Sequence, residues 1–503
     1  MIKDNNHQNK SINGNDSNGK IISLADIAHQ AMIERGFKPD FPSNVLQEVA
    51  AIPVPAAPHS KPDLRDMRGL LWISIDNDDS RDLDQLTFAE VTDTGINKIY
   101  VAVADVDALV HNRSFIDQYA RFNTTSVYTP TKVFPMLPER LSTDLTSLIE
   151  NADRFAIVVE MEITKEGEFK LLDIYPAWVI NKAKLTYNGV APFLEHKVPL
   201  NHPSKNIGEI QEQLKLQDLI ARHIKEYRFR QGALTLASSD IQPIIENGIP
   251  VGLKKSVHNR ANALIENFMI AANACVTRYL DKLQLPTLRR VVREPKRWDK
   301  IIDLANKYGS ELPPQPDAKA LRDFLIERHK ADPLQFPDLS IAVIKLIGRG
   351  EYVVGLPGKP APGHFDLALV EYAHTTAPNR RFPDLVMQRL LKSHFNETPS
   401  PYTNEELALI ADHCTQKEDD ASKVERRVRK SAAAMVIQPQ LGRSFAAMVT
   451  GASDKGTYVR LLAMPIEGRL TEGEHRYDVG DHLTVKLTHV DILKGFIDFA
   501  ESK

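Results

Sequence analysis

The spacing of apolar and polar residues predicts a β-sheet in the first half of the chain. The apolar runs at residues 70–75, 86–89 and 98–104 have the length of strands. Two further strand-like runs, at residues 155–163 and 169–179, are separated by a short Thr-Lys-Glu-Gly turn, which predicts a β-hairpin. We therefore expect strands to dominate this part of the fold.

A helical period replaces the strand pattern after the hairpin. The segments with this period are residues 207–230, 259–283, 297–308, 318–329, 339–347 and 403–436. Residues 445–499 then return to short alternating runs broken by turn sequences. The predicted fold class is therefore α+β, a mixed sheet with many helices followed by a small all-β domain.

An acidic stretch, Ser-Ile-Asp-Asn-Asp-Asp-Ser-Arg-Asp-Leu-Asp-Gln at residues 74–85, follows the first predicted strand. Asn, Asp and Ser favour solvated turns, and this explanation suffices for residues 77–80. It is less adequate for Asp82 and Asp84, which alternate in an extended segment and so point to one face. Asp76, at the strand end, can meet them across the loop. Three carboxylates without Cys or His predict a Mg²⁺ site, with Mn²⁺ as a substitute.

A calcium loop of the EF-hand type is the nearest competing interpretation. Asp76, Asp78 and Ser80 occupy its first, third and fifth positions. However, Arg81 stands in place of the required turn glycine, and Thr87 stands in place of the closing glutamate. The spacing therefore disfavours a calcium loop.

A second polar motif, Pro-Asn-Arg-Arg-Phe-Pro-Asp-Leu at residues 378–385, precedes another predicted helix. Pro383 suits the first helical turn, where free N–H groups and an arginine fork together favour a phosphate. Arg381 has the spacing to form a simple ion pair with Asp384. We therefore assign Arg380 to the phosphate and leave Arg381 structural.

Composition limits the class of protein. The chain has 503 residues, of which 42% are hydrophobic and 26% charged, as in globular proteins. It shows no apolar run of membrane-spanning length and no signal-peptide pattern. Two distant cysteines, Cys275 and Cys414, indicate a reduced, cytoplasmic setting. With a net charge of −3, any basic path for an anionic substrate must be local.

The order of several motifs resembles the ribonuclease II/R (RNB) family. These motifs are the acidic stretch, Val-Phe-Pro-Met-Leu-Pro-Glu-Arg-Leu-Ser at 133–142, Leu-Ile-Glu-Asn-Phe-Met at 264–269, Gly-His-Phe at 363–365 and the arginine motif. An ordered set of motifs is far more specific than any one of them. The resemblance implies a Mg²⁺-dependent, processive 3′→5′ exoribonuclease that hydrolyses single-stranded RNA to nucleoside 5′-monophosphates.

The resemblance also implies catalytic roles for four residues. Asp76, Asp82 and Asp84 stand where the family has metal-binding aspartates. Arg380 stands where the family has an arginine that contacts the scissile phosphate. The aspartates implied by the resemblance are therefore the ones that the residue pattern selects.

One position departs from the family. The family usually has another aspartate directly after the position of Asp84, and this chain has Gln85. Glutamine can ligate a metal through its carbonyl oxygen but brings no negative charge. A second metal ion would then be held more weakly, unless Asp78 or Asp79 compensates.

Three further residues resemble substrate contacts of the family. Tyr128 resembles the aromatic residue that clamps the terminal base, and Tyr187 resembles a second base-contacting tyrosine. Glu266 resembles the glutamate that holds the end of the RNA. The alternatives are ordinary ones, because both tyrosines have the pattern of core aromatics and Glu266 that of a solvated helix residue.

The C-terminal segment resembles an S1-type OB-fold. The matching features are Gly-Thr-Tyr-Val at 456–459, Glu-Gly at 467–468 and Val-Gly-Asp at 479–481. Tyr458, with Lys455 and Arg460, would form a surface for base stacking and phosphate contacts.

The family's usual N-terminal cold-shock barrels are not recognisable in this sequence. The expected division is a disordered tail (1–20), a helical region with a Pro-rich lead-in (21–65), the catalytic domain (66–400), a helical connector (401–440) and the S1-like domain (441–503).

Two classes of function remain open. The first is an active exoribonuclease whose partner is single-stranded RNA. The second is a catalytically weak or inactive RNB-type RNA-binding protein, which Gln85 makes worth considering. The joint presence of three aspartates and Arg380 favours the enzyme, because a pure binder has no evident need for a repulsive carboxylate cluster. The sequence identifies no protein partner.

Overall fold

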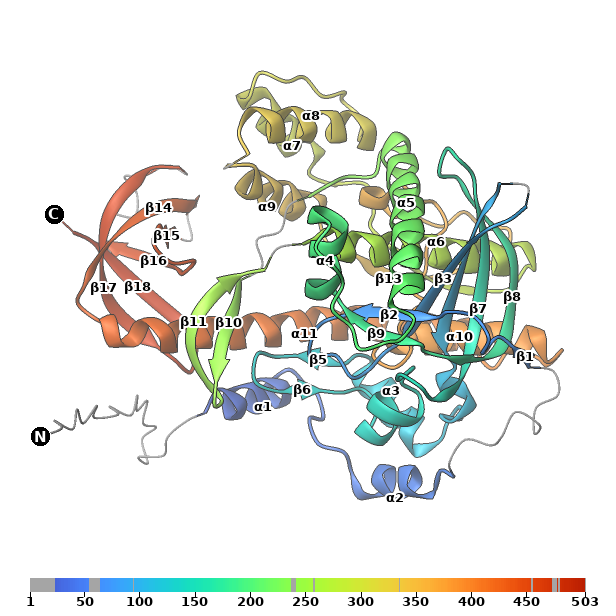
Figure 1. The fold of residues 1–503 in the computed structure, drawn as a ribbon. Coiled ribbons are helices and arrows are strands. Elements are labelled where there is room, and N and C mark those ends of the chain that lie inside the picture. Colours follow the sequence, from blue (N-terminus) through green and yellow to red (C-terminus); the bar gives the residue numbers. More distant parts are fainter. Residues whose placement is uncertain are drawn as a thin grey trace, which may run out of the picture.

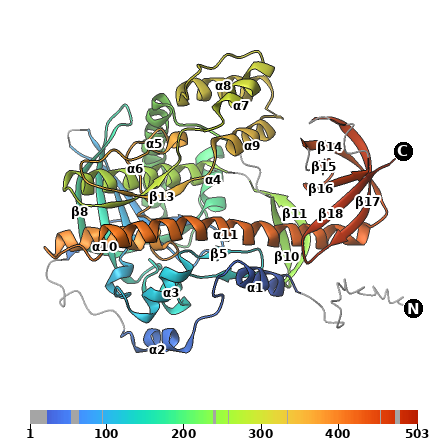
Figure 2. The same cartoon turned by 180° about the vertical axis from the view of Figure 1, so that it is seen from behind.

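The computed structural model describes residues 23–53, 64–93, 95–236, 241–256, 258–333, 335–453, 456–472, 477 and 480–502. The predicted disordered tail, most of the Pro-rich lead-in and Lys455 lie outside these ranges. Within them, the chain runs from a helical N-terminal segment, through a sheet covered by helices, to a small barrel (Figures 1 and 2). No helix in the described ranges combines the length and the apolar character that crossing a membrane requires.

A mixed sheet forms the centre of the molecule, with the strand order β1-β8-β7-β4-β3-β2-β9. Its strands are β1 (Arg65–Asp66), β2 (Ile73–Asp76), β3 (Gln85–Val91), β4 (Asn97–Ala104), β7 (Asp153–Ile163), β8 (Phe169–Ile180) and β9 (Ala183–Thr186). The pairs β1·β8 and β2·β9 are parallel, and the other neighbours are antiparallel. The predicted strands and the hairpin are confirmed, although β2 begins at Ile73 rather than at residue 70. The short strand β9 was not predicted, because four residues directly followed by a helix give too little pattern.

The predicted helices are also present. After the sheet come α4 (Tyr187–His196), α5 (Ile207–Gln231), α6 (Arg260–Lys282), α7 (Trp298–Lys307), α8 (Ala318–Ala331), α9 (Phe336–Ile347), α10 (Phe382–Phe395) and α11 (Asn404–Ile437). Helices α5 and α6 pack against the sheet, whereas α7, α8 and α9 share a separate apolar cluster (Figure 1). Helix α4 is an addition to the prediction, and it begins at Tyr187.

Smaller elements complete the fold outside the barrel. They are α1 (Leu24–Glu34), α2 (Ser43–Ala51), α3 (Phe115–Asn123), the hairpins β5 (Val127–Tyr128)/β6 (Val133–Phe134) and β10 (Ile241–Glu246)/β11 (Ile249–Lys255), the pair β12 (Thr287–Val291)/β13 (Glu351–Gly355), and the short turns η2 (Val106–Ala108), η3 (Leu141–Leu145), η4 (Phe365–Leu367) and η5 (Gln438–Gln440). The helices α1 and α2 confirm the helical region predicted within residues 21–65. The other elements were not predicted, and the two-residue strands and single turns among them leave no period to detect. Two of them, α1 and the β5–β6 hairpin, lie side by side against α11 in both views (Figures 1 and 2).

Buried ion pairs fix α10 to the end of the sheet. Arg389 donates to Asp107 at 2.9 Å and to Asp117 at 2.7 Å. Lys392 donates to Asp105, which directly follows β4, at 2.9 Å. Such pairs are costly to break once buried, because the remaining charge is left without compensation. The start of α10, which carries the arginine motif, is therefore held in a defined place.

The C-terminal segment is a closed five-stranded barrel, as the predicted OB-like domain requires. Its strands are β14 (Ser444–Ser453), β15 (Gly456–Leu461), β16 (Glu467–Glu472), β17 (His482–Asp491) and β18 (Phe496–Glu501), in the order β14-β15-β16-β18-β17. Ala434 and Ile437, at the end of α11, join the barrel core. Arg460 was predicted to face RNA phosphates, but it makes a two-pronged ion pair with Asp338 of α9 at 3.0 and 3.1 Å. It therefore ties the barrel to the helical layer.

Candidate active site

The acidic loop joins the end of β2 to the start of β3 and is anchored from β9 and α4. Lys184 Nζ donates to Ser80 O at 2.6 Å, and Asn188 Nδ2 donates to Asp78 Oδ2 at 2.5 Å. Asp78 and Asp79 are exposed, which agrees with the predicted solvated turn. The tip of the loop is thus a solvated turn held at two points, and the remaining acids lie closer to the sheet.

Asp84 is the most deeply buried of the predicted site residues, at 2% exposure. Its Oδ1 accepts a hydrogen bond from the Asn379 backbone N–H at 2.9 Å. Its Oδ2 lies 3.3 Å from Arg380 Nε but makes no hydrogen bond with any described residue. One buried carboxylate oxygen therefore lacks a hydrogen-bond donor.

The two other aspartates lie close enough to Asp84 or to each other to interact electrostatically. Asp82 accepts hydrogen bonds from Ser80 Oγ at 3.2 Å and from the Tyr128 hydroxyl at 2.5 Å. Burial raises the pKa of Asp76, and the Asp82 charge raises it further, while Arg380 opposes both. Burial likewise raises the pKa of Asp84 to about 8, in spite of the guanidinium of Arg380, and Asp82 adds to the increase. The cluster is thus short of positive charge.

The arginine motif approaches these carboxylates from the start of α10. Arg380 has 43% of its side chain exposed, so its guanidinium is open to a ligand as well as to Asp84. Arg381 instead donates to the fully buried Asp384 at 2.7 Å, which confirms the predicted structural pair. Pro383 lies in the first turn of α10, also as predicted.

Asn379 is a site residue that the sequence analysis missed. Its side chain is fully buried, and its Oδ1 accepts a 2.6 Å hydrogen bond from Thr146 Oγ1, next to η3. Its backbone N–H donates the hydrogen bond to Asp84, although the two residues are 295 positions apart in the sequence. No local pattern reveals a contact at that separation. The only available signal was the presence of a polar residue between Pro378 and two arginines.

The structure brings both predicted tyrosines to the carboxylates. Tyr128 is 40% exposed on β5, which is not the position of a core aromatic, and its hydroxyl bonds Asp82. Tyr187 follows Thr186, the partner of Asp76 in the β2·β9 register. Burial raises the pKa of the Tyr187 hydroxyl, and the nearby Asp76 carboxylate raises it further. Tyr187 is only partly buried and packs at the edge of the main core, so both aromatic rings border the site.

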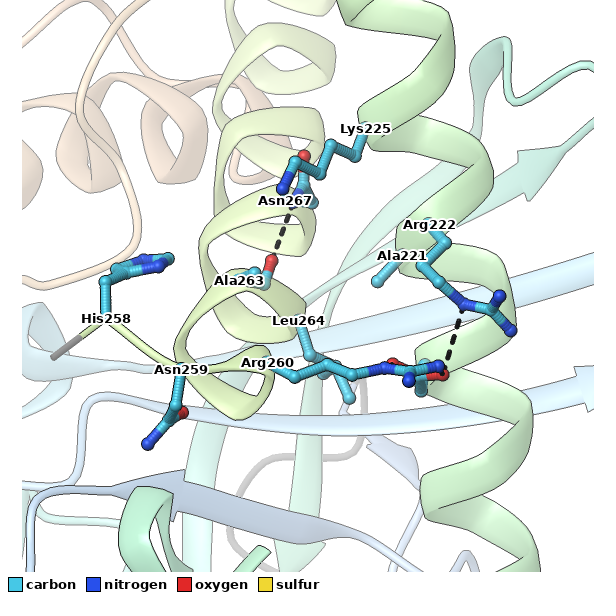
Figure 3. Close-up of a pocket in the computed structure, with 10 residues that line it drawn as sticks. Ala221, Arg222, Lys225, His258, Asn259, Arg260, Ala263, Leu264 and Asn267 are labelled. Carbon is cyan, nitrogen blue, oxygen red and sulfur yellow. Dashed lines mark hydrogen bonds and ion pairs between the residues drawn. The ribbon is translucent and has the colours of Figure 1, made fainter. Parts of the chain in front are cut away.

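Glu266 and Tyr458 belong to other parts of the surface. Glu266, on α6, pairs with His258 at 3.1 Å. His258 lines a cavity of about 360 Å³ between α5 and α6, in which Arg222 and Arg260 reach the same acidic side chain, Asp218 (Figure 3). The cavity is linked to the site because Asn259 Nδ2, at its edge, donates to the backbone carbonyl of Tyr187 at 3.4 Å.

Tyr458 lies on β15 of the barrel. It is 38% exposed and stands directly across from Arg469 of β16. Cross-strand partners share one face of a sheet, so an aromatic ring and a guanidinium group lie together on the barrel surface. This surface resembles the stacking and phosphate contacts of single-strand binders.

Family models match two regions of the chain. Residues 64–397 match the RNB domain. Residues 443–502 match the RNase II-type exonuclease C-terminal S1 domain. Both regions are those in which the sequence analysis found its resemblances.

The chain is similar to proteins named ribonuclease R. The protein of Thermotoga maritima is 30% identical over 499 residues, a match that covers 92% of this chain and 68% of that protein. The protein of Escherichia coli K12 is 28% identical over 504 residues, covering 92% of this chain and 60% of that protein. The chain thus spans roughly two thirds of the length of these relatives.

Solved structures share the fold. Mycoplasma genitalium RNase R, in complex with ribose methylated single-stranded RNA, has a TM-score of 0.87 at 23% identity, covering 96% of this chain and 79% of that chain. Yeast Ssd1, described as a pseudonuclease, has a TM-score of 0.73 at 17% identity, covering 94% of this chain and 59% of that chain. Because one of these proteins is a pseudonuclease, the fold by itself does not decide whether hydrolysis occurs.

Proposed function

The chain belongs to the RNB family, and on this basis we propose that it is a metal-dependent, processive 3′→5′ exoribonuclease that hydrolyses single-stranded RNA to nucleoside 5′-monophosphates. Its class, an exoribonuclease hydrolase, follows from the family. The metal, the processivity and the product are our proposals. The processivity and the product are what the family resemblance implies. The observation that carries the metal is the buried carboxylate of Asp84, which lies beside Arg380 with one oxygen not hydrogen-bonded by any described residue.

We propose that Asp76, Asp82 and Asp84 hold Mg²⁺, with Mn²⁺ as a substitute. Carboxylate oxygens without thiolates or imidazoles suit these hard cations. The fit rests on Asp84, whose Oδ2 has no hydrogen-bond partner in the described residues and whose burial disfavours its charge. A bound cation would coordinate this oxygen and balance the negative charge of the carboxylate. As a Lewis acid, it would activate the phosphate and the attacking water.

The remaining residues orient and stabilise the reacting groups. Arg380 would donate to the phosphoryl oxygens as negative charge grows in the transition state. Asn379 fixes the Asp84 carboxylate through its backbone N–H, so that the acid does not have to reorganise. The Tyr128 ring would stack on the terminal base, a contact worth roughly 1–3 kcal/mol that tolerates any base. Such stacking requires unpaired bases, which agrees with single-stranded RNA as the substrate.

We also propose a cytoplasmic location. Cys275 and Cys414 are both free and buried. Burial raises the pKa of the Cys275 thiol to about 12, so this group is neither ionised nor reactive at neutral pH. Unpaired cysteines of this kind are usual in reducing compartments.

The test of the activity uses the purified full chain and a 5′-labelled single-stranded oligoribonucleotide, with Mg²⁺ or with EDTA, on a denaturing gel. With Mg²⁺ we expect the full-length RNA to be replaced by a short 5′-end product with few intermediates, as processive degradation requires, and with EDTA we expect intact RNA. The same RNA labelled at its 3′ end should release labelled mononucleotide from the first time point, because degradation begins there. Intact RNA under both conditions would refute the proposed activity.

The second candidate function is RNA binding without hydrolysis. It is favoured by Gln85, which brings no charge to the cluster, and by the likeness of the fold to that of Ssd1. In addition, the described residues contain no group of three or more His, Cys, Asp or Glu side chains already arranged to hold a metal. We prefer hydrolysis because a buried carboxylate such as Asp84 is costly to fold and brings no benefit to a pure binder. A shifted band on a native gel, with no cleavage in Mg²⁺, would favour this second function.

Tyr128 has two separable roles, and a pair of variants distinguishes them. Tyr128→Phe keeps the ring but removes the hydroxyl that bonds Asp82, so we expect cleavage about tenfold slower with an unchanged final product length. Tyr128→Ala also removes the stacking surface and should leave a longer final product. Single-turnover rates and end-product lengths on a denaturing gel measure the two effects. End products of equal length in the alanine variant would count against the clamp.

A further inference from the structure

The N-terminal helix α1 shares a hydrophobic core with the β5–β6 hairpin and with α11. All of its inward-facing residues are buried, among them Ile27 at 2% exposure and Met32 at 1%. The cluster that they form includes Val127 and Phe134 of the hairpin and Val424 of α11. The hairpin therefore rests on a surface to which α1 contributes directly.

The hairpin carries a site residue on its opposite face. Successive side chains of a strand point to opposite sides, so Val127 enters the α1 core while Tyr128 faces the carboxylates. On the α11 side, the backbone N–H of Tyr128 donates to Glu425 Oε1 at 3.1 Å. The position of the Tyr128 ring is therefore set by the packing of its neighbour Val127 and by α11.

The same segment also holds the arginine motif. The Arg380 carbonyl accepts from the backbone N–H of Ser126 at 2.9 Å and from Thr125 Oγ1 at 3.2 Å. The backbone N–H of Phe382 donates to the carbonyl of Thr124 at 2.8 Å. Residues 124–126 thus connect the hairpin to the loop that presents the Arg380 guanidinium.

The chain that follows α1 fixes the other end of this segment. The backbone N–H of Lys38 donates to Asn123 Oδ1 at 3.0 Å, and Asn123 Nδ2 donates to the backbone carbonyl of Lys38 at 2.9 Å. The Tyr119 hydroxyl donates to the Lys38 carbonyl at 2.6 Å. Asn123 ends α3 and directly precedes Thr124, which has a positive φ of 60°. The start of the segment is therefore held by residues N-terminal to the catalytic domain.

We propose that residues 23–41 are a positioning element of the active site, which sets Tyr128 and Arg380 through the β5–β6 hairpin. This inference rests on the proposed exoribonuclease function. Protein interiors are close-packed, so a cavity in the apolar cluster that α1 shares with Val127 allows the hairpin to shift. The element reaches the site indirectly, through the core that it shares with the hairpin and through the bonds of Lys38 to Asn123.

The test compares two matched Ile→Ala variants of the full chain. Ile27→Ala opens a cavity in the α1 core, and Ile301→Ala opens one in the separate cluster of α7, α8 and α9, where Ile301 is fully buried. Binding of a single-stranded oligoribonucleotide is measured in EDTA, where no cleavage interferes. We expect binding about fivefold weaker in Ile27→Ala, because part of the stacking contact is lost, and unchanged binding in Ile301→Ala. With Mg²⁺, only Ile27→Ala should leave a longer final product.

A double variant separates positioning from general destabilisation. If α1 acts through Tyr128, adding Ile27→Ala to Tyr128→Ala should change RNA binding and product length little further, because both changes remove the same contact. Fully additive effects, or equal RNA binding by Ile27→Ala and Ile301→Ala, would overturn the proposal.

If Ile27→Ala does not fold, Ile27→Val is measured in its place. RNA binding weakened about twofold supports the proposal, and RNA binding equal to that of the wild type refutes it. A wild-type protein that cleaves no RNA refutes the proposed function, while the binding measurements in EDTA still decide this inference.

Discussion

The Asp84→Asn variant is expected to hydrolyse RNA on the order of 10³-fold more slowly than the wild-type protein, with unchanged affinity for single-stranded RNA. Asparagine keeps the shape of the side chain and the oxygen that accepts a hydrogen bond from the Asn379 N–H. It removes the negative charge with which, in our proposal, Asp84 binds the cation. The RNA-facing surface is unaffected, because Asp84 is only 2% exposed. Single-turnover cleavage in Mg²⁺ measures the rate, and binding in EDTA measures the affinity.

The matched control is Asp79→Asn, the same change at an exposed position of the same loop. We expect wild-type cleavage from this variant. A marked loss in Asp79→Asn would instead show that Asp79 compensates for the charge missing at Gln85. Cleavage at the wild-type rate by Asp84→Asn would refute the assignment of Asp84 as a metal ligand.

The same variant separates catalysis from folding. Burial raises the pKa of Asp84 to about 8, so the ionised carboxylate opposes folding when no cation is bound. A neutral asparagine removes this cost and keeps the hydrogen bond to Asn379. We therefore expect the melting temperature of Asp84→Asn in EDTA to be equal to or above that of the wild type, which excludes misfolding as the cause of lost activity.

The elements that sequence could predict are those with a local signal. The strand before Asp76 and the strand after Gln85 each have an apolar run, so the acidic loop between them follows directly. The Arg381–Asp384 pair is three residues apart at a helix start, and its spacing alone suggests it. The short strands of the C-terminal segment likewise follow from repeated alternation and turns, whereas their closure into a barrel was implied by the resemblance to an S1-type OB-fold.

The contacts that complete the site have no local signal. Asn379 meets Asp84 only because α10 is held at the end of β4 by buried ion pairs. The bond from the Tyr128 hydroxyl to Asp82 depends on a two-residue strand whose place is set by α1 and α11. The ion pair of Arg460 was missed for a related reason, since its partner Asp338 lies on a helix from another layer. Tertiary packing, which a single sequence does not display, decides all three.

The Arg380→Lys variant is the second change with a large expected effect. We expect RNA cleavage slower by about 10²-fold to 10³-fold with little change in melting temperature. Lysine keeps the charge but replaces a planar fork of donors with a single ammonium group, which cannot hold a phosphoryl group and Asp84 together in the same geometry. Because 43% of the Arg380 side chain is exposed, water can solvate the new side chain and the fold does not suffer. Single-turnover rates and thermal melts measure the two effects.

The neighbouring arginine provides the control, because the identical substitution there should have the opposite outcome. Arg381 donates to Asp384, a carboxylate with no exposed surface, so Arg381→Lys weakens a buried, charge-assisted bond. We expect that variant to lose roughly 1–3 kcal/mol of folding stability while the folded fraction cleaves RNA at close to the wild-type rate. If instead Arg380→Lys cleaves normally and Arg381→Lys does not, the phosphate contact belongs to Arg381. In that case the division of roles between the two arginines is reversed, and the ion pair between Arg380 Nε and Asp84 Oδ2 is merely structural.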